Sequence, residues 1–93
     1  MAQIVVVLKG DPENIVSQLN TLALANEIQF ITKTKSAGQY LVGYETISTS
    51  QSVVALKGDP ESISDKLQTI LLTEVVDVFS KTFSNSVYIV VKR

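Results

Sequence analysis

The stretch of sequence best suited to ligand chemistry is Lys-Gly-Asp-Pro-Glu at 9–13, which recurs unchanged at 57–61. Each copy follows a short apolar run and precedes an amphipathic segment, so each is expected at a strand-to-helix junction. Helix N-termini attract anions, and a glycine lets the backbone approach a phosphate closely. The residues that would form two equivalent ligand-binding corners are Lys9, Gly10, Lys57 and Gly58.

The composition of these corners nevertheless favours a structural role. A phosphate-cradling loop usually has several glycines and a Lys or Ser/Thr just inside the helix. Here Asp11 and Asp59 stand at helix N-cap positions, each followed by a proline and a glutamate. Such residues satisfy the free N–H groups of the first turn and complement its dipole. Capping and turn formation are therefore the main interpretation, and a small-molecule or nucleotide sensor that uses both corners is the alternative.

Enzyme chemistry has few candidate residues. The chain contains neither cysteine nor histidine, which excludes disulfides, thiolate nucleophiles and the commonest metal ligands. No pair of carboxylates sits within an apolar run, where burial would raise a pKa as in a catalytic acid. We therefore expect no catalytic residue, metal or cofactor. The protein is not predicted to be an enzyme, and a small enzyme is only a third, less favoured interpretation.

The whole sequence is a tandem duplication with an offset of 48 residues. Residues 5–45 align with 53–93 without a gap, and 17 of the 41 pairs are identical. A half of this size would struggle to bury enough surface alone. The sequence thus predicts a single domain, 1–93, whose repeats 1–47 and 48–93 share one core about a pseudo-twofold axis.

Each repeat is expected to fold as β-α-β-β. In the first, an apolar run at 4–8 predicts a central strand that is buried on both faces. Ile15, Leu19, Leu22 and Ala23 form the buried stripe of a helix that ends near 25–26. Alternating residues at 27–35 and 39–45 predict two further strands, joined by a short turn at 36–38. The second repeat gives strands at 53–56, 75–83 and 87–92, with a helix opening at 59–60 and a turn at 84–86.

The expected fold class is α+β. Two such units side by side would give a two-layer sandwich, with a mainly antiparallel six-stranded sheet and both helices on one face. In outline this resembles the broad ferredoxin-like class. The chain order β-α-β-β-β-α-β-β differs from that class, so the likeness concerns the layers and implies no function.

A three-residue turn in each repeat fixes the expected strand register, with Tyr44 opposite Phe30. In this register the residues that face the helices are Ile28, Phe30, Tyr40, Val42 and Tyr44 in the first repeat, and Val76, Val78, Tyr88 and Val90 in the second. The opposite sheet face is mixed in the first repeat, where it includes Ile31 and Leu41, and nearly all apolar in the second. The apolar residues of the second repeat on that face are Phe79, Phe83, Val87, Ile89 and Val91.

Soluble monomers rarely expose so large an apolar patch. The leading functional hypothesis is a non-catalytic binding or assembly module that forms an even-numbered homo-oligomer through this sheet face. Two structural alternatives compete with it: the patch closes on the same chain, or a register shift of one residue exchanges the faces.

Charge and hydropathy limit the other classes of partner. The net charge of −1 arises from scattered acidic and basic residues, so a nucleic-acid partner is not favoured. No apolar run approaches the about 18 to 20 residues of a membrane helix, and the N-terminus lacks the pattern of a secretion signal. A cytoplasmic protein with no membrane association is expected.

Overall fold

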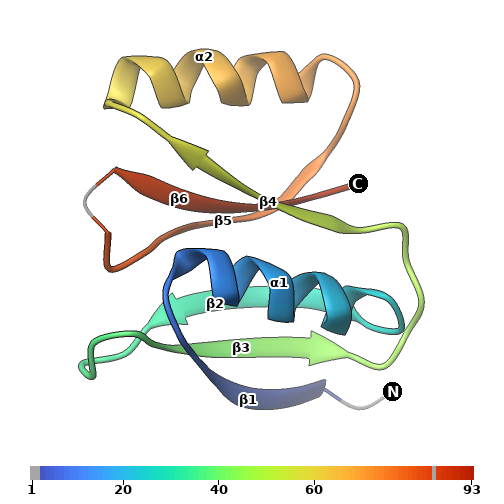
Figure 1. Ribbon diagram of the computed structural model, residues 1–93. Coiled ribbons are helices and arrows are strands. Elements are labelled where there is room, and N and C mark those ends of the chain that lie inside the picture. Colours follow the sequence, from blue (N-terminus) through green and yellow to red (C-terminus); the bar gives the residue numbers. More distant parts are fainter. Residues whose placement is uncertain (1–2, 85) are drawn as a thin grey trace.

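The computed structural model describes residues 3–84 and 86–93, so the turn expected at 84–86 includes one residue, Asn85, outside the described part. Both repeats have the order β-α-β-β, as predicted (Figure 1). The elements are β1 (Gln3–Lys9), α1 (Pro12–Ala23), β2 (Glu27–Lys33), β3 (Gln39–Glu45), β4 (Ser52–Lys57), α2 (Pro60–Leu71), β5 (Val76–Lys81) and β6 (Val87–Lys92).

The six strands form two separate three-stranded antiparallel sheets. The first sheet has the order β1-β3-β2 and the second has the order β4-β6-β5. The single six-stranded sheet expected from the sequence is not formed, although the α+β class and the repeated unit are confirmed. Pairing stays within each repeat because short turns join its last two strands and its first strand completes the local sheet.

The layers are stacked in the order α2, second sheet, α1, first sheet (Figure 1). One hydrophobic cluster joins Ile15 and Leu19 of α1 to Val42 of the first sheet and to Ile89 and Val91 of the second. The helix α1 is therefore covered on both sides, whereas α2 has the second sheet on one side only.

This asymmetry means that the repeats are not related by a twofold axis. The first repeat offers its helix to the contact, and the second repeat offers the sheet face that points away from α2. A twofold axis would require the same surface from both partners, so this contact is heterologous. The expected pseudo-twofold arrangement is accordingly wrong.

A register shift in one edge strand of each sheet changes which side chains face the helices. The shift lies between Ile28 and Phe30 in β2 and between Val76 and Val78 in β5. After it, the strand continues one residue out of the expected phase, because an extra residue opposes one partner residue.

Residues directly opposite each other in a sheet share a face. Ile31 lies opposite Val42, and Phe79 lies opposite Val90, so both side chains turn toward the helices. Phe30 and Val78 turn to the outer faces. The predicted faces of these four residues are wrong, whereas those of the central strands β3 and β6 are correct.

Candidate interaction surfaces

The two Lys-Gly-Asp-Pro corners have the local geometry of helix starts. Asp11 caps α1 by accepting the N–H of Asn14 at 2.9 Å, and Asp59 caps α2 by accepting the N–H of Ser62 at 2.9 Å. A proline occupies the start of each helix. The position that a bound anion would take is thus already filled by a carboxylate of the chain itself.

The glycines of the corners provide a backbone conformation that other residues rarely adopt. Gly10 has a φ of 144° and Gly58 a φ of 142°. The N–H of Gly10 donates to the carbonyl of Gly38 at 2.9 Å, and that of Gly58 donates to the carbonyl of Ser86 at 3.0 Å. These amides hold the corner against the turn of the same repeat, so they are not directed at a ligand.

The lysines of the corners do not converge on one site. Lys57 Nζ lies 3.9 Å from Glu13 Oε1 of the other repeat, and both side chains are well exposed. The carbonyl of Lys9 accepts from Gln18 Nε2, and the carbonyl of Lys57 accepts from Lys66 Nζ. The Lys57–Glu13 pair therefore bridges the two repeats at the surface, where such pairs contribute about 0–1 kcal/mol to stability.

The interface residues predicted from the second repeat do not share one environment. Ile89 and Val91 do lie on the face opposite α2, but they are 0% exposed because α1 of the same chain covers them. Phe83 packs edge-on against Tyr40 with ring centroids 5.2 Å apart, and its N–H donates to the Tyr40 hydroxyl at 3.0 Å. Val87, the first residue of β6, is half-buried.

The remaining predicted interface residues are also separated. Phe79 is 44% exposed but lies on the α2 side, where it stacks on Tyr88 at 5.3 Å. Ile31 is buried in the core next to α1. Leu41 is half-buried on the outer face of the first sheet. The predicted set is thus not one surface: the second sheet closes on the same chain, and a shifted register moves Ile31 and Phe79.

Two amide side chains each form a pair of hydrogen bonds with the backbone of one residue across the contact between the repeats. We call this arrangement a clasp. Asn20 of α1 accepts the N–H of Val53 and donates to its carbonyl, both at 2.9 Å. Gln51 accepts the N–H of Ile28 at 2.7 Å and donates to its carbonyl at 3.1 Å. Each clasp satisfies a donor and an acceptor of a strand whose backbone would otherwise lack partners.

The outer face of the first sheet is one apolar surface that the described residues leave open. Its members are Val5, Val7, Phe30 and Leu41, which share the face because Val5 and Phe30 both oppose Gly43 and Val7 opposes Leu41. Val5, Val7 and Phe30 are 56%, 49% and 45% exposed. The Phe30 ring lies over Gly43, in space that a Cβ at position 43 would require.

Sequence reasoning missed most of this face. The run of valines at 5–7 indicated a strand buried on both sides, and the register shift hid the position of Phe30. The repeat itself was the available signal. Val5 and Phe30 occupy the positions of Val53 and Val78 in the second copy, so each pair belongs to the same face of its sheet.

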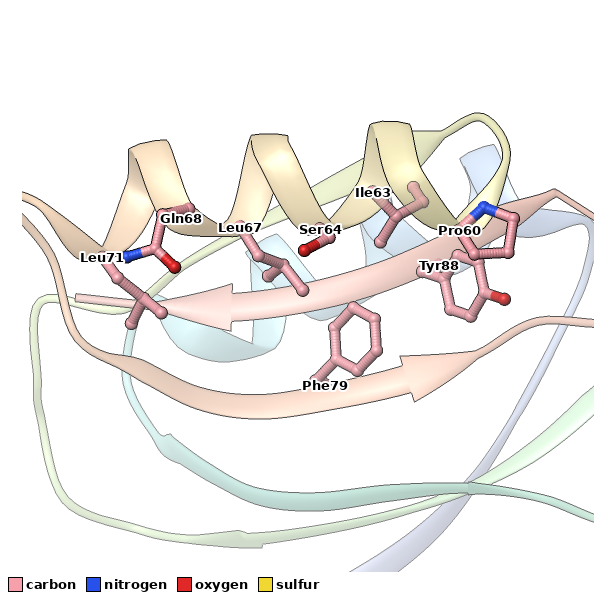
Figure 2. Close-up of a pocket in the computed structure, with 8 residues that line it drawn as sticks. All are labelled: Pro60, Ile63, Ser64, Leu67, Gln68, Leu71, Phe79 and Tyr88. Atoms are coloured by element: carbon pink, nitrogen blue, oxygen red, sulfur yellow. The ribbon is translucent and has the colours of Figure 1, made fainter.

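A second open apolar surface is a groove of about 330 Å³ beside α2. Figure 2 shows Ile63, Leu67 and Leu71 pointing down from α2, with the ring of Phe79 rising from β5 toward them and the ring of Tyr88 on β6. We call this surface the α2 groove. Ser64 and Gln68 of the helix also line it, so the lining of the groove is mainly apolar with two polar side chains from α2.

Comparison with protein-family models, with curated proteins and with solved structures gives no significant match. Within residues 3–84 and 86–93, no group of three or more acidic side chains is placed to hold a metal ion. Neither helix in that part of the chain is long and apolar enough to cross a membrane.

Proposed function

We propose that this protein is a non-catalytic assembly module that forms homo-oligomers through the outer face of its first sheet. The observation that carries the proposal is the exposure of Val5, Val7 and Phe30 on one face of a three-stranded sheet. Contiguous exposed apolar side chains of this kind mark contact surfaces, because hydration of apolar area is unfavourable.

The second sheet supports the proposal by comparison within the same molecule. Val53 and Ile89, which correspond to Val5 and Leu41, are 3% and 0% exposed, and Val78, which corresponds to Phe30, packs against the same cluster around α1. The same type of face is thus used for a protein contact in one copy and left bare in the other. Self-association would bury the bare copy in the same way.

The test is the mass of the protein in solution as a function of concentration. We expect sedimentation velocity of the wild-type chain to show species larger than a monomer that grow between low micromolar and millimolar concentration. Phe30→Asp should reduce this association strongly, since it places a charge in the centre of the apolar face at a position that the fold leaves exposed. A wild-type chain that remains monomeric over the whole range would contradict the proposal.

A further inference from the structure

We propose that one copy of this chain docks the outer face of its first sheet into the α2 groove of another copy, so that the contact between the repeats is repeated between molecules. This inference depends on the proposed self-association and adds the partner surface and the geometry of assembly. The two halves of one chain differ in what covers each of these surfaces.

The α2 groove corresponds residue by residue to a site that is filled in the first repeat. With the offset of 48, Ile63, Leu67 and Leu71 match Ile15, Leu19 and Ala23 of α1. Phe79 and Tyr88 of the groove match Ile31 and Tyr40. All five counterparts in the first repeat are at most 7% exposed, in the cluster that the second sheet helps to enclose. In the groove Ile63 is also buried, at 5%, but Leu71 is 52% and Phe79 44% exposed.

The outer face of the first sheet corresponds in turn to the surface that fills that site. Val5, Phe30 and Leu41 match Val53, Val78 and Ile89. Val53 and Ile89 belong to the cluster that encloses α1, and Val78 packs against it. One molecule thus carries the open half of this contact at one end and the complementary open half at the other (Figure 1).

The polar contacts across the repeat boundary can also be formed between molecules. Gln51, which clasps the backbone of Ile28, is matched by a second glutamine, Gln3, at the exposed start of β1. In the docked pair Gln3 would reach Val76, the counterpart of Ile28. Gln3 is exposed in the single chain, so its side chain is accessible to a neighbouring molecule.

Two further polar contacts across the repeat boundary also have counterparts on the two open surfaces. Lys57 and Glu13 approach each other across the boundary, and their counterparts Lys9 and Glu61 are both retained at the two open ends. Asn20, which clasps Val53, is replaced by Gln68, which keeps the amide group on a side chain one methylene longer. Opposite charges at corresponding positions would favour the same docking register.

The differences between the copies concern the size of the apolar groups. Phe30 replaces Val78, while Gly43 replaces Val91 and leaves room for the Phe30 ring on the sheet. The edge contact that Phe83 makes with Tyr40 is not repeated, since Lys35 stands at its position. Phe30 instead brings an aromatic ring to the α2 groove, whose volume of about 330 Å³ is open to receive it.

The contact is heterologous, so each docked molecule still presents one free surface of each kind. Heterologous contacts build rings when the rotation closes and open chains when it does not. The expected assembly is therefore a head-to-tail series that extends beyond the dimer, in place of the even-numbered oligomer expected from a twofold axis.

The test uses one variant for each surface, measured alone and mixed, by sedimentation velocity. Phe30→Asp removes the sheet surface and Leu71→Asp removes the groove, and both positions are about half exposed, so the fold should be retained. Each variant alone should be monomeric. An equimolar mixture should form a one-to-one heterodimer and nothing larger, because the intact sheet of one variant fits the intact groove of the other.

A neighbouring position provides the matched control. Leu72 is 77% exposed and its counterpart Leu24 stays exposed beside the filled site, so Leu72→Asp should assemble as the wild type does. If circular dichroism shows that Leu71→Asp is unfolded, Ser64→Glu introduces a charge at an exposed position of the same groove.

The outcomes separate this inference from the proposed function. If Leu71→Asp and Ser64→Glu assemble like the wild type while Phe30→Asp is monomeric, the sheet face pairs with itself, and only the head-to-tail inference is wrong. If the wild type is monomeric at every concentration, both are wrong. A heterodimer that forms only in the mixture supports both.

Discussion

The side-chain amide of Asn20 forms two hydrogen bonds with the backbone of Val53, each 2.9 Å long. Asn20 Oδ1 accepts the N–H of Val53, and Asn20 Nδ2 donates to its carbonyl. The two residues are 33 positions apart and belong to different repeats. Val53 is 3% exposed, so water has little access to replace these two hydrogen bonds. The clasp therefore ties the first helix to the edge strand of the second sheet.

We expect Asn20→Ala to lower the free energy of unfolding by about 1–3 kcal/mol, because it leaves a buried donor and acceptor without partners. Urea denaturation followed by circular dichroism measures the change. Gln68→Ala is the matched control, since Gln68 occupies the same position on α2 and is exposed. At concentrations too low for association it should change stability by less than about 0.5 kcal/mol. Equal losses in the two variants would contradict the assignment of the clasp.

Ile89 and Leu41 provide a second comparison of equivalent positions. Ile89 is 0% exposed beneath α1, and Leu41 is half-buried on the outer face of the first sheet. Ile89→Ala should destabilise the chain by about 2–5 kcal/mol, through lost burial and the cavity that remains.

Leu41→Ala should cost clearly less in the monomer, since its side chain already contacts water. Thermal unfolding of both variants at low protein concentration tests the difference. A cost at Leu41 as large as that at Ile89 would mean that the outer face of the first sheet is covered in the monomer as well.

The local elements of this fold could be predicted from the sequence because their signals are local. Asp11 and Asp59 mark helix starts that the structure reproduces with the same hydrogen bond in each copy. The faces of β3 and β6 also follow from strict alternation, since a central strand with partners on both sides has a fixed phase.

The phase of β2 and β5 could not be predicted, because an irregularity between Ile28 and Phe30, and again between Val76 and Val78, leaves no distinctive residue in the sequence. A one-residue shift moves every later side chain to the other face. This shift placed Phe79 beside α2 and Phe30 on the outer face, and so changed the composition of the candidate site.

The surfaces through which the two repeats stack could not be predicted either. Each repeat has two apolar surfaces, the groove beside its helix and the face on the other side of its sheet, and composition does not say which pair will meet. The identical pair Gln3 and Gln51 was the available indication, because a glutamine kept at a strand start points to a shared backbone contact.

Gln51 and Gln3 give the prediction that links monomer stability to assembly. Gln51 is buried. Its side chain accepts a hydrogen bond from the N–H of Ile28 and donates to the carbonyl of Ile28 and, at 3.0 Å, to the carboxylate of Asp77. Gln51→Ala should therefore lower the free energy of unfolding by about 1–3 kcal/mol. Gln3→Ala should leave unfolding at low concentration unchanged, since Gln3 is exposed in the single chain.

In self-association the order of the two variants should be reversed, so that Gln3→Ala has the larger effect and Gln51→Ala the smaller one. Gln3→Ala should shift the self-association of the chain to higher concentration, because the clasp on Val76 of the next molecule is lost. Gln51→Ala should associate like the wild type wherever it remains folded, since its partner lies within the same chain. Sedimentation equilibrium at a temperature well below unfolding measures both, and association of Gln3→Ala equal to that of the wild type would show that the glutamine clasp is not repeated between molecules.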